Sequence, residues 1–139
     1  MTLLAEYISH HPLLVGVTAL CAVALLAVEL RARRLGTAAI GTQDAVRLMN
    51  QGAAVLDVRS REEFAAGHLR NARHAPLDGL DAVAEGLKRF KERPVLVYCE
   101  RGGRAVTAIE RLRGLGFNQL FNLRGGIAAW RSDHLPLDK

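Results

Sequence analysis

The stretch most suited to chemistry is Cys99–Arg104, with the sequence CERGGR, which we call the cysteine loop. It follows VLVY at 95–98, an apolar run that predicts a buried strand, and a helix is predicted to begin near Arg104. The two glycines allow a tight turn in which successive N–H groups face inward and form an anion site. The helix start adds partial positive charge, and Arg101 adds a full charge. We therefore expect the pKa of the Cys99 thiol to lie below its usual value of about 8.5.

A thiolate at Cys99 can carry a sulfur atom. It would attack the outer sulfur of a small anionic donor, and the loop amides would hold the resulting persulfide until a second nucleophile removed the sulfur. The expected catalytic residues are Cys99 and Arg104, and the expected substrate-binding positions of the loop are Glu100, Arg101, Gly102 and Gly103. The Glu100 side chain is expected to be solvated and to oppose the thiolate slightly. A cysteine that only packs in the core is the alternative, but glycine pairs and arginines have no packing purpose there.

The remaining cysteine and the histidines give no sign of a metal or a disulfide. Cys21 lies in an apolar segment of different character from the segment around Cys99, so a disulfide is not expected. The five histidines are scattered and no CxxC motif is present. We predict no structural metal and no cofactor.

The N-terminal segment is predicted to be a membrane anchor. Residues 7–28 contain no Asp, Glu, Lys or Arg. As a helix they would measure about 33 Å, close to the bilayer's hydrocarbon thickness of about 30 Å. Pro12 suits an interfacial first turn, so residues 13–30 are expected to lie in the membrane, within an anchor segment at 1–34. A buried core helix is the less favoured alternative, because so long a run without charge rarely fits inside a small domain.

Three arginines set the expected orientation of this helix. Arg31, Arg33 and Arg34 follow the apolar run, whereas a signal peptide has its basic residues before it. By the positive-inside rule the N-terminus is then outside and everything after residue 31 is cytoplasmic. Thiols stay reduced in the cytoplasm, so Cys99 would be available as a nucleophile.

The part after the anchor is basic. All 19 Lys and Arg lie at 31–139, together with 12 of the 14 acidic residues. Such a charge suits nucleic acid, anionic lipid or a small anionic substrate. Nucleic acid is the least favoured of these partners, because the arginines are dispersed and not interleaved with stacking aromatic residues.

Hydrophobic patterning predicts one α/β domain at 35–139. A linker at Leu35–Ala39 leads into a brief strand ending at Ile40. Further strands are predicted at 53–58, 72–75, 95–98 and 120–123, and helices at 42–49, 61–66, 77–90, 104–115 and 127–130. Strands that alternate with helices favour a parallel sheet covered on both faces, a three-layer α/β domain. Ligands bind such sheets beyond the carboxyl ends of the strands, where Cys99 lies.

Local signals define some of these helices. Thr42 is a candidate N-cap for the helix at 42–49. Ser60 and Glu63 form the S-x-x-E capping box of the helix at 61–66. In the helix at 104–115 we expect Val106, Ile109 and Leu112 to face the core.

Three motifs resemble those of the rhodanese family, in the right order and over residues 38–131. The first is Asp57-Val58-Arg59 followed by Glu63-Phe64-Ala65-Ala66-Gly67-His68-Leu69. The second is the cysteine loop as C-x-x-G-x-R after Val97-Tyr98, and the third is L-x-G-G-x-x-A-W at 123–130. The resemblance implies a rhodanese-like domain with a five-stranded parallel sheet in the order 3-2-4-5-1. It also implies sulfur transfer through Cys99, with the amides of residues 100–104 and the Arg104 side chain around the sulfur.

The resemblance also suggests roles for residues outside the loop. Asp57 and Arg59 complete the expected substrate-binding set near the site, where fixing neighbouring loops is favoured over a direct catalytic role. Gly67 and His68 are expected in a turn, and Trp130 in the core. Arg73 departs from the family pattern and is expected to face solvent. One such domain behind one helix also resembles small bacterial proteins of the inner membrane.

Two other functions stay open. Phosphatases and arsenate reductases of the dual-specificity type resemble this loop, but with seven residues where Cys99–Arg104 has six. A membrane-tethered binding module for a membrane-protein partner is the second alternative. The favoured function is a sulfurtransferase that takes sulfur from a thiosulfate-like or persulfide donor to a thiol or other nucleophilic acceptor.

Overall fold

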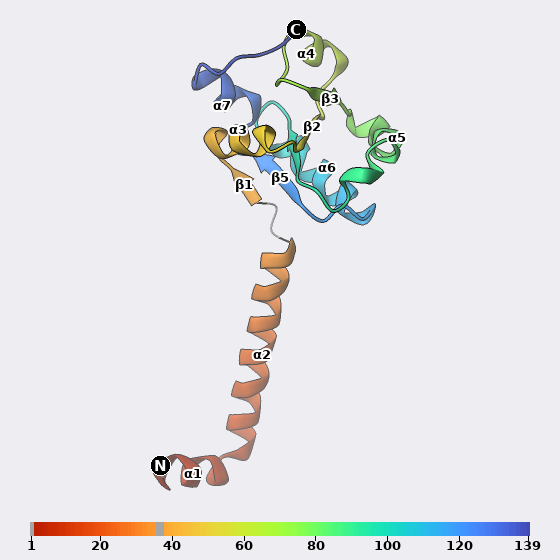
Figure 1. Ribbon diagram of the computed structural model, residues 1–139. Coiled ribbons are helices and arrows are strands. Elements are labelled where there is room, and N and C mark those ends of the chain that lie inside the picture. Colours follow the sequence, from red (N-terminus) through yellow and green to blue (C-terminus); the bar gives the residue numbers. More distant parts are fainter. Residues whose placement is uncertain (1, 36–37) are drawn as a thin grey trace. The chain divides into compact units, whose positions relative to one another are not determined.

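The computed structural model describes residues 2–35 and 38–139, drawn in Figure 1. The chain divides into two compact units, Met1–Gly36 and Thr37–Lys139. Each is described by itself.

The first unit consists of two helices, α1 (Thr2–His10) and α2 (Pro12–Leu35). Pro12 is the first residue of α2, where its missing N–H would have had no partner in the helix. Within α2, the 18 residues Pro12–Glu29 are long and apolar enough to cross a membrane, judged by length and composition alone. They are unburied in the described structure.

The linker predicted at residues 35–39 is wrong at both of its ends. Leu35 still belongs to α2, and Ala38 and Ala39 already belong to the first strand. The rest of that linker, residues 36–37, lies outside the described residues.

The second unit is built on a five-stranded, fully parallel sheet, as expected. Its strand order is β1-β5-β4-β2-β3, which confirms the predicted 3-2-4-5-1 arrangement. The strands are β1 (Ala38–Ile40), β2 (Ala54–Asp57), β3 (Ala72–His74), β4 (Val95–Tyr98) and β5 (Leu120–Leu123). The first strand of the sheet therefore pairs with the last.

Helices cover both faces of this sheet and make the predicted three layers (Figure 1). One face carries α3 (Thr42–Asn50) and α7 (Gly126–Ser132), and the other carries α5 (Leu80–Glu85) and α6 (Gly103–Gly114). A short helix, α4 (Arg61–Ala66), joins β2 to β3. The helix predicted at 77–90 is wrong as one element, because the segment divides into η1 (Leu77–Gly79), α5 and η2 (Lys88–Phe90), with Gly86 following the end of α5.

Alternation along β4 decides which way the residues near the site face. Val97 and Cys99 pack in the apolar cluster beneath α5 and α6, whereas Leu96 and Tyr98 pack in the cluster beneath α3 and α7. Successive side chains of a strand point to opposite faces. Cys99 therefore faces the layer of α6, and Tyr98 faces the other layer.

Two local predictions about helices are wrong. The N-cap of α3 is Gly41, and Thr42 lies inside the helix with its hydroxyl donating to Asp133 at 2.5 Å. Val106 is 39% exposed, although Ile109 and Leu112 are buried as expected. The buried residues of α6 are Ala105, Ala108, Ile109 and Leu112, which have the spacing of a single helix face, and Val106 falls beside that face.

Candidate active site

The site is centred on Cys99, which directly follows β4 at the carboxyl edge of the sheet and is only 2% exposed. The backbone N–H of Gly102 donates to Cys99 Sγ over 3.0 Å. Gly102 has a φ of +112°, a conformation that side chains with a Cβ rarely adopt. Of the amides at residues 100–104 expected around the sulfur, this one makes the bond.

A buried amide from the neighbouring strand supports the turn. Asn122 of β5 donates from Nδ2 to the Gly102 carbonyl over 3.3 Å. Its Oδ1 is buried and has no hydrogen-bond partner among the described residues. Sequence reasoning missed Asn122, although a polar residue inside the apolar strand LFNL was the available signal.

The Gly125-Gly126 turn holds the other side of the cysteine loop. Ile127 N donates to the Cys99 carbonyl over 2.9 Å, and Ala128 N donates to the Glu100 carbonyl over 3.1 Å. Gly126 has a φ of +61°, and a Cβ there would lie 2.4 Å from both carbonyl oxygens. The glycine pair of the third motif thus allows α7 to begin directly against the backbone of the cysteine loop.

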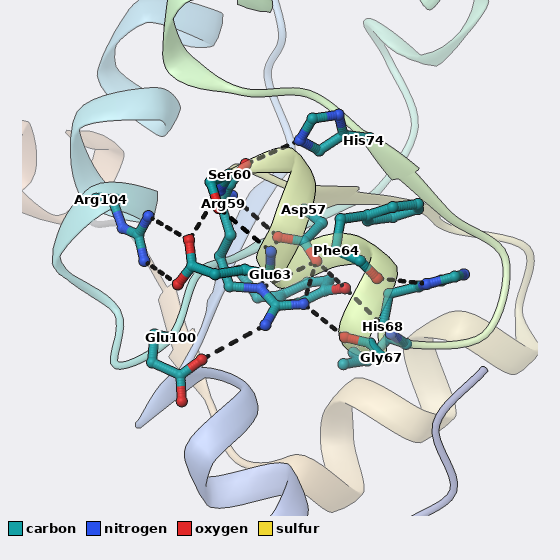
Figure 2. Close-up of polar contacts among 12 residues, drawn as sticks. Asp57, Arg59, Ser60, Glu63, Phe64, Gly67, His68, His74, Glu100 and Arg104 are labelled. Carbon is teal, nitrogen blue, oxygen red and sulfur yellow. Dashed lines mark hydrogen bonds and ion pairs between the residues drawn. The ribbon is translucent and has the colours of Figure 1, made fainter. Parts of the chain in front are cut away.

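The Arg104 guanidinium is bonded to a carboxylate of α4. Its Nη1 and Nη2 donate to the two oxygens of Glu63, each over 2.9 Å (Figure 2). The predicted capping box is confirmed: Ser60 N donates to Glu63 Oε2 over 2.8 Å, and Glu63 N donates to Ser60 Oγ over 3.2 Å. The Arg104 bonds, followed by the Ser60 N–H bond, lower the pKa of Glu63 to about 2.

The expectation of a solvated Glu100 side chain is wrong. One of its oxygens accepts from Arg131 over 2.8 Å, and the other lies 3.5 Å from Arg59 Nη1. Arg131 lies in α7, whose first turn is bonded to the backbone of Glu100. This packing brings the Arg131 guanidinium and the Glu100 carboxylate together. Arg101, by contrast, is exposed and makes no ion pair within the described residues.

Asp57 and Arg59 form a fully buried ion pair beside the cysteine loop (Figure 2). Arg59 Nη2 donates to Asp57 Oδ2 and to the Gly67 carbonyl, each over 2.7 Å. Burial is the largest single effect and lowers the pKa of Arg59, but the bond to Asp57 and the nearby negative charges together raise that pKa above its usual value. The pair joins the end of β2 to the end of α4, and within the described residues it makes no hydrogen bond to Cys99 Sγ.

Tyr98 connects this pair to the central strand. Its hydroxyl donates to Asp57 Oδ2 over 2.7 Å and accepts from Leu69 N over 3.1 Å. Burial raises the pKa of Tyr98 well above its usual range, and the Asp57 charge acts in the same direction. The phenol therefore remains a donor to Asp57 at any physiological pH.

The other residues noted in the sequence lie around these groups. Gly67 caps α4, His68 stacks on Phe64 with ring centroids 4.0 Å apart, and Trp130 is 3% exposed. Arg73 is exposed. Glu63, Arg131 and Tyr98 were not identified as site residues from the sequence, because each acts through a partner remote in the chain.

The arrangement of a buried cysteine, an inward-facing amide and a glycine turn at the carboxyl edge agrees with the comparison to known families. A model of the Rhodanese-like domain family matches residues 42–133. The chain belongs to this family.

Relatives of this rhodanese-like domain include enzymes that transfer sulfur. Thiosulfate sulfurtransferase GlpE of Pseudomonas entomophila is 34% identical over 68% of this chain and 85% of its own. The polysulfide-sulfur transferase of Wolinella succinogenes has a similar structure, with a TM-score of 0.64 and 26% identity over 83% of this chain and 88% of that chain. These similarities support a sulfurtransferase family.

Another relative matches more than the rhodanese-like domain. The uncharacterized protein YibN of Escherichia coli K12 is 29% identical over 95% of this chain and 94% of its own. A match of this extent includes residues of the N-terminal helices as well as the domain.

Proposed function

We propose that the protein is a membrane-anchored sulfurtransferase that carries sulfane sulfur as a persulfide on Cys99. The observation that carries the proposal is the 3.0 Å bond from Gly102 N–H to Cys99 Sγ at the carboxyl edge of the sheet. A donor at this position stabilises negative charge on sulfur more than it stabilises a neutral thiol. The similarity to thiosulfate sulfurtransferase GlpE supports the same reaction class.

The reaction consists of two displacements at sulfur. In the first, the Cys99 thiolate uses a lone pair to form a bond to the outer sulfur of a thiosulfate-like or persulfide donor. The donor's own bond to that sulfur breaks, and its electron pair leaves with the departing anion. In the second, an acceptor thiolate attacks the terminal sulfur, and the electrons of the Cys99 S–S bond return to Sγ. No outside oxidant or reductant is needed.

The charged residues around Cys99 have mainly positioning roles in this proposal. Arg104 is bonded to Glu63, so its charge acts on the sulfur from a fixed place. The bond to Glu63 raises the pKa of Arg104, so its guanidinium stays charged. Arg101 is exposed and is the candidate for the first contact with an anionic donor.

The N-terminal helix supplies the membrane part of the proposal. Pro12–Glu29 would span the inner membrane, and Arg31, Arg33 and Arg34 would keep the rhodanese-like domain on the cytoplasmic side. The length of the apolar segment and the arginines that follow it support this orientation.

Intact-protein mass after incubation with thiosulfate tests the sulfur chemistry. We expect the full chain to gain one sulfur atom, and the gain to be removed by a small thiol. The Cys99→Ala variant should gain none, whereas Cys21→Ala, the matched control, should gain sulfur as the wild type does. In parallel incubations with a phosphate ester or arsenate, a phosphorylated or arsenylated wild-type chain would favour a phosphatase or arsenate reductase instead. A cellular phenotype that survives Cys99→Ala would favour a binding module.

A further inference from the structure

The charges of the domain differ between the two edges of its sheet. Because all five strands are parallel, their carboxyl ends share one edge and their amino ends share the other. At the carboxyl edge, three arginines are neutralised in ion pairs: Arg59 with Asp57, Arg104 with Glu63 and Arg131 with Glu100. These three guanidinium charges are thus balanced by carboxylates, and Arg101 of the cysteine loop is an exposed cation without an ion pair within the described residues.

The amino edge carries unbalanced cations in the segment that leads into β4. Arg89, Lys91 and Arg93 lie here, and we call these three residues the basic edge. None of them makes an ion pair within the described residues. The guanidinium carbons of Arg89 and Arg93 lie 5.0 and 5.2 Å from the ring centroid of Phe90, which is itself buried.

Neighbouring acids leave this charge in place. Lys88 is paired with Glu85 over 2.6 Å, so those two charges cancel. The Glu92 carboxylate accepts from Asn118 over 2.8 Å and makes no ion pair within the part of the chain that is described. The basic edge therefore carries three positive charges against the one negative charge of Glu92. The side chains of Arg89 and Arg93 are exposed.

Chain connectivity limits how far the same edge can lie from the proposed anchor. Strand β1 begins at Ala38, so its amino end lies at the edge where β4 also begins. Only residues 30–37 separate the end of the apolar segment at Glu29 from Ala38. Eight residues span at most about 28 Å even when fully extended. The covalent link thus limits the distance between the amino end of β1 and the end of the apolar segment.

We propose that the basic edge binds the anionic headgroups of the membrane that holds the chain. The proposal depends on the membrane anchor proposed above. Anionic phospholipid is the proposed partner because the cations of the basic edge make no ion pair within the described residues and only a short link separates the domain from the anchor. Basic groups next to a membrane are attracted to the negative charge of its lipid headgroups. In this proposal the edge that carries the cysteine loop is turned away from the lipid.

Hydrogen exchange of the full chain in nanodiscs tests this surface. Amides at residues 86–93 are compared in discs of phosphatidylcholine alone and in discs that also contain phosphatidylglycerol. We expect several-fold slower exchange in the anionic discs, and loss of this protection at high salt, because added ions shorten the screening length from about 8 Å.

A pair of variants with the same charge change separates the basic edge from general electrostatics. Arg89→Gln/Arg93→Gln should lose the lipid-dependent protection, whereas Arg61→Gln/Arg73→Gln, which removes two exposed arginines elsewhere, should keep it. Both variants should still gain sulfur on Cys99, which shows that each domain is folded.

Three results would overturn the proposal. Equal exchange rates in the two disc types, with the chain retained in the bilayer, would overturn the basic-edge proposal and leave the membrane anchor in place. Extraction of the chain from membranes by alkaline carbonate would contradict both the proposed membrane anchor and this proposal. The sulfurtransferase proposal would still stand if Cys99 gained sulfur. Protection that appears only after addition of cytoplasmic extract would assign the basic edge to an acidic protein.

Discussion

At the scale of single residues, charge near Cys99 is held in place by carboxylates. Glu63 accepts from Arg104 through both oxygens, and Ser60 N–H fixes one of the same oxygens. A guanidinium bound in this two-point manner has one orientation and loses little freedom when the sulfur becomes charged. The carboxylate therefore determines where the Arg104 charge lies.

Acid should loosen this contact in a defined range. The folded-state pKa of Glu63 is about 2 against an ordinary value of 4.5, so the stabilisation is fully present above pH 4.5 and is lost as the pH falls through about 2. We expect the thermal midpoint of Glu63→Gln to fall less steeply than that of the wild type between these values. Glutamine keeps the capping box, which isolates the charge.

Thermal unfolding followed by circular dichroism at a series of pH values makes the measurement. Glu110→Gln, on the exposed surface of α6, is the matched control and should follow the wild type. Identical slopes for Glu63→Gln and the wild type would show that the ion pair does not contribute to stability.

The Glu63–Arg104 contact also shows a limit of sequence reasoning. The two residues are 41 positions apart, and the sequence marked each for a different reason, one for a capping box and one for an anion site. Their pairing depends on β2 and β4 being neighbours in the sheet. Cys99 itself was predictable, because its loop, its strand and its glycines are contiguous.

At the scale of elements, the start of α7 acts as a support for the cysteine loop. Its N–H groups at Ile127 and Ala128 bind the carbonyls of Cys99 and Glu100. These two carbonyls of the cysteine loop are thus bonded to α7, and the Gly102 N–H of the same loop is directed at the sulfur. Geometry at the sulfur thus depends on a turn from another part of the chain.

A methyl group at this turn should disturb the reaction. Gly126→Ala places a Cβ 2.4 Å from two carbonyl oxygens and at a φ of +61°. The backbone conformation alone costs about 1–2 kcal/mol. We expect a lower thermal midpoint and reduced sulfur gain by intact mass. Gly114→Ala, where a Cβ meets nothing within 4 Å, is the control and should retain both. Full sulfur gain by Gly126→Ala would mean that α7 does not shape the loop.

Elements were predictable where their signals are local. Ser60 and Glu63 are three residues apart and both act on the same helix end, so the capping box was confirmed. The predictions for Thr42 and Val106 were wrong because both depend on packing with distant parts of the chain. The Thr42 hydroxyl bonds to Asp133, and Ala105 occupies the core position expected for Val106. Short apolar patterns do not define which of two adjacent residues faces inward.

At the scale of the whole molecule, anchor and domain are expected to be separable in function. A chain that lacks residues 1–35 loses the apolar helix but none of the strands of the sheet. We expect it to leave the membrane fraction and still to gain sulfur on Cys99. Fractionation followed by intact mass measures both properties. Retention of the shortened chain in carbonate-washed membranes would contradict an anchor at residues 13–30.

The pairing of β1 with β5 has a consequence for how the protein is made. Residues 38–40 find their partner only at 121–123, roughly 80 residues later in the chain. At a synthesis rate of roughly 5–20 residues per second, the first strand waits about 4–16 s before its neighbour exists. During that interval the growing polypeptide exposes an unfinished sheet while its leading helix has already emerged. Ribosomal pace and chaperone access therefore matter more for this chain than for one whose opening strands pair early.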